Sequence, residues 1–191
     1  SGKKDSAAVY YTNSLLAYNE ALRFNKNNPY VRETAAKGYL SYGKYMGQEQ
    51  GNIPGAITLL EKARQLDSTN ADIYFSLGTA YSLNRQYDLM LANAQKSVAL
   101  MPEDINAVEN LATAFQVFVY ETGQQKVLLL AAEQLLLKVL DTRRQMPDSN
   151  PDKKGGLIRC LDLLQKNYAL QGNPAREQEV KNERLKCSSG N

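Results

Sequence analysis

A fixed spacing of 34 residues constrains this chain more than any other feature of its sequence. In the stretch from Ala71 to Asp104, four residues fall at spacings of 3, 1 and 3, which is one stripe of a helix: Tyr74, Leu77, Gly78 and Tyr81. The same stripe recurs 34 residues later as Val108, Leu111, Ala112 and Phe115. A period of that length is typical of an array of stacked helix pairs.

Residues 71–104 resemble a tetratricopeptide repeat (TPR), whose first helix carries an aromatic residue, then Leu-Gly, then Tyr. Tyr74 stands where Trp is usual, the Leu-Gly pair and Tyr81 match, and Pro102 closes the unit. The second helix departs from the pattern, with Met90 where Ala is expected and Ala94 where an aromatic residue is expected. Because these two lie four residues apart on one helical face, the exchange conserves volume, and we expect both in the core.

The resemblance implies an all-α fold, a right-handed superhelical array of antiparallel helix hairpins (a TPR-like α-solenoid) with about nine helices. We expect one domain over residues 1–191, with Asp5 and Ser6 capping its first helix. Its parts are a lone helix (1–28), a repeat with a long first helix (29–70), the best-matching repeat (71–104), a lengthened repeat (105–150), a degenerate capping hairpin (151–187) and a tail (188–191). The lone helix is the second half of a truncated repeat or a cap.

Two irregular segments leave alternatives open. Seven of the twelve tyrosines lie in the first 45 residues, where they replace larger core residues or face a groove or a missing preceding segment. The leucine-rich helix at 125–145 has an apolar face too wide for one-sided burial. It is either sandwiched between repeats or exposes a patch for a partner, and self-association through it is a further hypothesis.

Composition excludes several classes of function. Histidine is absent, and no phosphate-binding glycine loop or nucleophile motif is present, so we predict no enzyme, no metal and no cofactor. The net charge of +3 and the period of 34 argue against nucleic acid. No apolar run reaches the length of a membrane span, which predicts no membrane insertion in this segment. Cys160 and Cys187 are either a disulfide across the last hairpin or two unrelated thiols.

A binding surface is what remains. The resemblance implies that first helices line a concave face and bind a protein or peptide partner. Carried over by position, that face comprises Leu40, Lys44, Phe75, Thr79, Ser82, Asn106, Glu109, Asn110, Thr113 and Gln116. Only Lys44 and Asn110 hint at a grip on a C-terminal carboxylate, too few to predict one. The alternative function is an accessory domain of a larger membrane-linked enzyme, of the glycosyltransferase or polymerase type. The compartment is left open, with a slight preference for an extracytoplasmic (periplasmic) over a cytoplasmic location.

Overall fold

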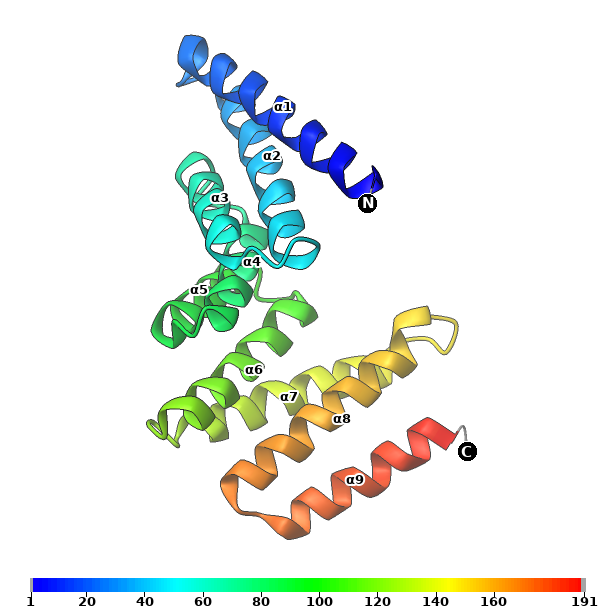
Figure 1. Ribbon diagram of the computed structural model, residues 1–191. Helices are drawn as coiled ribbons and strands as arrows, with labels where there is room; N and C mark the ends of the chain where they lie inside the picture. Colours follow the sequence, from blue (N-terminus) through cyan, green and yellow to red (C-terminus); the bar gives the residue numbers. More distant parts are fainter. Residues whose placement is uncertain (1, 190–191) are drawn as a thin grey trace. The chain divides into compact units, whose positions relative to one another are not determined.

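The computed structural model describes the backbone of residues 2–189 and the side chains of residues 6–189. Across these residues the chain forms nine α-helices and no strand (Figure 1). The helices are α1 (Gly2–Asn25), α2 (Pro29–Gln48), α3 (Ile53–Leu66), α4 (Ala71–Leu83), α5 (Tyr87–Leu100), α6 (Ile105–Thr122), α7 (Leu128–Gln145), α8 (Pro151–Gln171) and α9 (Pro174–Ser189). They group into two compact units, with α1–α5 in unit 1 (residues 1–100) and α6–α9 in unit 2 (residues 101–191). The prediction of an all-α array of helix hairpins is confirmed.

Asparagine or aspartate side chains start most of these helices. Asn28 accepts hydrogen bonds from the backbone N–H groups of Tyr30 (3.0 Å) and Val31 (3.4 Å), which have no partner inside the helix. The same role falls to four further residues, at the starts of α3, α4, α6 and α8: Asn52, Asn70, Asp104 and Asn150. The predicted cap at Asp5 and Ser6 is wrong, because α1 already begins at Gly2 and both residues lie inside it.

In unit 1, α2 pairs with α3 and α4 pairs with α5, and α3 also packs on α4. Met90 and Ala94 are both buried on the face of α5 that meets α4. A Cβ built on Gly78 would lie 3.5 Å from the Met90 carbonyl oxygen and from the Ala94 nitrogen. The small Ala94 therefore lies where the backbones of α4 and α5 are in contact at Gly78, and the expectation that Met90 and Ala94 both lie in the core is confirmed.

Tyrosines attach α1 to α2. The ring of Tyr11 stacks on that of Tyr42 with centroids 5.0 Å apart and planes 5° apart, and Tyr45 lies 5.1 Å away. Tyr39 is buried and its hydroxyl donates to Asn19 Oδ1 at 2.5 Å. Of the seven tyrosines in the first 45 residues, Tyr39 alone is buried, and the others are half-buried or exposed. The interpretation of tyrosine as a core residue therefore holds at this one site.

Unit 2 sandwiches the leucine-rich helix α7 between α6 and α8. Its inner faces bury Leu129, Ala132, Leu136, Val139, Leu140 and Arg143. The interpretation of a helix between repeats is therefore confirmed. Leu130 and Leu137 still point outward, together with Val127 just before the helix, and self-association through them stays a prediction.

The last helix, α9, buries none of its described side chains. Ion pairs attach it instead: Arg144 of α7 lies 2.5 Å from Glu183, and Arg184 pairs with Asp162 of α8. The helix continues two residues into the predicted tail, whose remaining residues 190 and 191 lie outside the described part.

Candidate functional site

Unit 1 carries five of the residues predicted to bind a partner, on α2 and α4. Lys44, Phe75 and Thr79 line a groove of about 450 Å³ between these two helices and α3. Leu40 is buried and does not line the groove, and neither does the half-buried Ser82. Three of the five positions carried over from the repeat pattern therefore line the same groove.

The α2–α4 groove is apolar with one cation. Leu60 and Ala56 of α3 form part of its lining, and Phe75 is half-buried beside them. The hydroxyl of Thr79 donates to the Phe75 carbonyl oxygen of its own helix (3.1 Å). Within the described residues, no carboxylate forms an ion pair with the half-buried Lys44, whose ammonium is available to an acidic group on a ligand.

Glu109, predicted to face the open surface of α6, lies inside unit 2 instead. Its Oε2 lies 2.5 Å from Nη2 of Arg143, and both residues are buried. The guanidinium occupies the space above Gly156 of α8, where an added Cβ would lie 2.0 Å from Nη1. Glu109 thus forms a structural ion pair with Arg143 that joins α6 to α7, and its side chain is unavailable to a partner.

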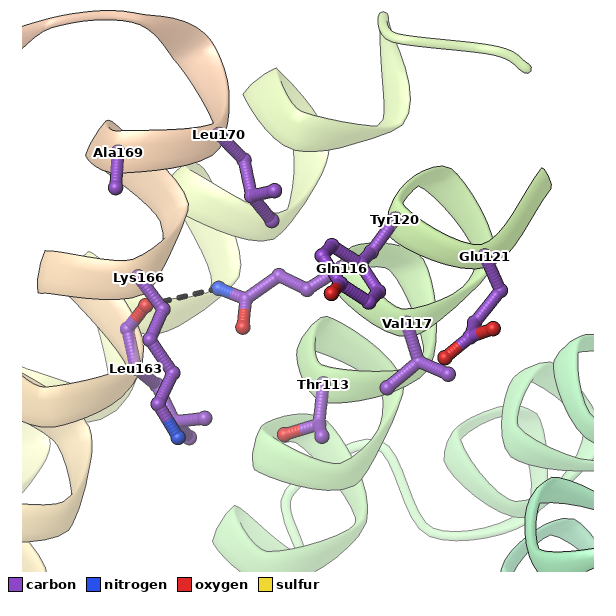
Figure 2. A pocket seen from close by; sticks show the side chains of 9 residues that line it. All are labelled: Thr113, Gln116, Val117, Tyr120, Glu121, Leu163, Lys166, Ala169 and Leu170. Carbon is purple, nitrogen blue, oxygen red and sulfur yellow. Dashed lines mark hydrogen bonds between the residues drawn. The ribbon is translucent and has the colours of Figure 1, made fainter. Parts of the chain in front are cut away.

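Gln116, the last predicted residue, is buried as well, yet it borders a pocket. Its Nε2 donates to the Leu163 carbonyl oxygen (2.9 Å) and to Asn167 Oδ1 (3.3 Å). Figure 2 shows this amide reaching from α6 across to α8. Because both amide hydrogens are committed to α8, the side-chain oxygen of Gln116 is the group left to accept a hydrogen bond.

This α6–α8 pocket measures about 370 Å³. Its lining combines two predicted residues, Thr113 and Gln116, with residues of both helices that the sequence analysis missed: Val117, Tyr120, Glu121, Leu163, Lys166, Ala169 and Leu170 (Figure 2). Apolar groups dominate, and the hydroxyl of Thr113 is already bonded to the Glu109 carbonyl oxygen of its own helix (2.9 Å). Tyr120 stands at the rim with 72% of its surface exposed.

The missed residues carried a signal in the sequence. Val117 and Tyr120 follow the predicted Thr113 at spacings of four and three residues, which is one stripe of a helix, and extending the prediction one turn beyond Gln116 would have found both. Asn106 is exposed and Asn110 half-buried on the earlier turns of α6, and neither lines the pocket. The α8 wall could not be found this way, because the last hairpin lacks the Leu-Gly pair that sets the frame.

The two cysteines are free in the structure. Cys160 is fully buried and donates to the Leu136 carbonyl oxygen of α7 at 3.2 Å. Burial, and then the nearby charge of Glu109, raises the pKa of the Cys160 thiol to about 12. Among the described residues, no cluster of acidic or cysteine side chains has the arrangement of a metal site. None of the helices in the described part of the chain is long and apolar enough to span a membrane.

Comparison with known proteins finds a TPR repeat in part of the chain and solved structures with a similar fold. A family model of the TPR repeat matches residues 49–84, which span α3 and α4. The solved structure of MamA is similar with a TM-score of 0.64 and 20% identity, over 99% of this chain and 95% of that one. PilW, described as a widely conserved type IV pilus biogenesis factor, is similar with a TM-score of 0.60 and 16% identity, over 93% and 86%. No curated protein matches the chain.

Proposed function

We propose that this tetratricopeptide-repeat protein is a non-catalytic scaffold that binds an extended segment of a protein partner on the open faces of its first helices. The observation that carries the proposal is the α6–α8 pocket, which joins an apolar lining to one fixed hydrogen-bond acceptor. Its volume of about 370 Å³ suits one large side chain and part of its neighbours.

The chemistry of the pocket selects the ligand class. Leu163, Leu170 and Val117 favour a large aliphatic or aromatic side chain. The oxygen of Gln116 accepts a hydrogen bond from a backbone N–H of the ligand or from a Trp or Tyr side chain. The lining also carries two exposed charges: Lys166 favours an acidic residue beside that anchor, and Glu121 favours a basic one. In unit 1, the unpaired Lys44 beside Phe75 repeats the combination of an apolar surface with one cation.

Neither pocket is equipped for catalysis. In the described part of the chain, the polar groups lining the two pockets are Ser and Thr hydroxyls bonded to their own helix, the phenol of Tyr120, amides, single ammonium groups and the carboxylate of Glu121. No nucleophile there is paired with a base, which a hydrolytic or transfer site requires. This supports a binding role.

A random peptide library displayed on phage, selected on the whole chain, tests the proposal. Selected peptides should share one large apolar residue, and their affinities are then measured by calorimetry. Tyr120→Ala should weaken binding at least about tenfold, since exposed aromatic residues at a pocket rim are frequent hot spots. Tyr30→Ala is the matched control, because Tyr30 is equally exposed (76%) but borders neither pocket.

Equal losses from both substitutions, or no loss from Tyr120→Ala, would contradict the assignment to the α6–α8 pocket. Phe75→Ala tests the α2–α4 groove in the same assay, with circular dichroism to confirm unchanged helix content. The accessory-domain hypothesis stays a prediction, which the sequence of the full-length gene tests.

A further inference from the structure

The side-chain amide of Gln116 has one fixed orientation, because a series of hydrogen bonds sets which end faces α8. The side-chain nitrogen of Asn167 donates to the Leu129 carbonyl oxygen (2.9 Å), so the oxygen of Asn167 is the end that faces Gln116. The second acceptor next to Gln116 Nε2 is also a carbonyl oxygen, that of Leu163 (2.9 Å). Reversing the Gln116 amide would place its oxygen against both of these oxygens, so only the nitrogen can face them.

The side-chain oxygen of Gln116 is therefore a fixed acceptor. Only 5% of the surface of this residue is exposed, and no group in the described residues donates a hydrogen bond to that oxygen. Figure 2 shows the oxygen pointing into the α6–α8 pocket, between Thr113 and Leu163. Because a buried acceptor without a donor costs free energy, a ligand that supplies the donor binds better than one that does not.

The interior of the pocket offers acceptors but no free donor. Both amide hydrogens of Gln116 are directed at α8, and the hydroxyl hydrogen of Thr113 is bonded within α6 (2.9 Å). The other polar groups of the lining belong to the exposed residues Tyr120, Glu121 and Lys166. A side chain that fills the interior should therefore donate a hydrogen bond and carry no acceptor of its own.

We propose that the α6–α8 pocket binds a tryptophan side chain of the partner segment, whose indole N–H donates to Gln116 Oε1. This inference rests on the proposed peptide-binding function. Among the natural side chains, tryptophan alone combines a large apolar ring system with a donor and no acceptor. Tyrosine and a backbone amide each bring an acceptor as well, and Lys or Arg would bring a charge into an apolar interior. The volume of about 370 Å³ admits the ring, and the phenol of Tyr120 adds an aromatic contact beside it.

The phage selection described above supplies the probes. Peptides whose capture is lost in Tyr120→Ala are ligands of this pocket, and they should share a tryptophan. One of them is synthesised with its tryptophan and again with benzothienylalanine, in which a sulfur atom replaces the indole N–H. Calorimetry on the whole chain should give about tenfold weaker binding for the second peptide, because Gln116 Oε1 is then desolvated without a donor. The chain contains no tryptophan, so a shift of indole emission to shorter wavelength reports burial of the peptide's own ring.

Gln116→Met tests the acceptor itself. Methionine has a similar length but no strong acceptor, so the two peptides should bind this variant equally. Gln134→Met is the matched control, because Gln134 is exposed on α7 and lines neither pocket, and it should keep the tenfold difference. Circular dichroism checks that both variants stay helical. The comparison of the two peptides on the wild type requires no substitution and decides the matter even if Gln116→Met does not fold.

Two results would overturn the tryptophan anchor and leave the proposed function intact. One is a set of Tyr120-dependent peptides anchored by leucine, phenylalanine or tyrosine. The other is equal binding of the tryptophan and benzothienylalanine peptides to the wild type. A selection that returns no Tyr120-dependent peptide would contradict the proposed use of this pocket, and this inference with it.

Discussion

Replacing Gly156 by alanine measures how much the buried ion pair of unit 2 contributes to the free energy of unfolding. A Cβ at this position would lie 2.0 Å from Arg143 Nη1 and 2.6 Å from its Cζ. Both residues are buried, so the guanidinium must leave its place. Moving it separates Nη2 from the Oε2 of Glu109, now 2.5 Å away, and leaves a buried carboxylate without its counter-charge.

Two opposing effects set the size of the change. Breaking a buried ion pair on one side costs about 3–5 kcal/mol. The lower end applies here, because Glu109 Oε1 and Arg143 Nε already lack hydrogen-bond partners among the described residues. Alanine in place of glycine inside a helix gains about 1 kcal/mol. The free energy of unfolding should therefore fall by about 2 kcal/mol, against the trend for glycine-to-alanine changes in helices.

Urea unfolding followed by circular dichroism measures this difference, and hydrogen exchange of peptides from α6, α7 and α8 assigns it to unit 2. Gly155→Ala is the matched control on the same helix. Gly155 is exposed, and an added Cβ there meets only Arg159 Nη1 at 3.7 Å, so this variant should gain up to about 1 kcal/mol. If Gly156→Ala proves as stable as Gly155→Ala, the ion pair does not hold α6 and α7 together as argued.

Ion pairs attach α9, and salt screens ion pairs. Raising the NaCl concentration from about 0.05 M to about 1 M should therefore accelerate hydrogen exchange in α9 more than in α8. An equal response of the two helices would argue against this attachment. Burial, and then the hydrogen bond to Glu61, raises the pKa of Tyr81 from its usual 10.0 to about 12. The unfolded chain therefore loses this proton first, and the stability present below pH 10 is lost as the pH rises toward 12. Urea midpoints of Tyr81→Phe should fall less over this range than those of the wild type. In a thiol assay on the folded protein, Cys187 should react while the fully buried Cys160, its pKa raised to about 12, waits for unfolding; equal rates would refute the burial of Cys160.

The regular part of the fold could be predicted because its signal is local. The spacing of Tyr74, Leu77, Gly78 and Tyr81 specifies a face of α4. Its recurrence 34 residues later specifies the matching face of α6. Even the departure at Met90 and Ala94 could be anticipated, since residues four apart share a face and their volumes compensate.

The candidate site was predicted less well because it depends on contacts between helices. Counting along the repeat pattern placed Glu109 on the open face of α6, but a buried Arg143 from α7 draws its carboxylate inward. Gln116 is drawn toward α8 by the carbonyl oxygen of Leu163, 47 residues away. Sequence spacing specifies which residues share a helix face, but it does not specify which distant group will meet that face.

The stack of Tyr11 on Tyr42 gives unit 1 an optical reporter of its own. The chain contains twelve tyrosines and no tryptophan, so its near-ultraviolet signal arises mainly from phenol rings. Two of these rings lie parallel with centroids 5.0 Å apart, one on α1 and the other on α2. Ring pairs this close couple electronically, and their dichroism vanishes when they separate. The docking of α1 on α2 can therefore be followed in the unlabelled protein, without a dye or an engineered tryptophan.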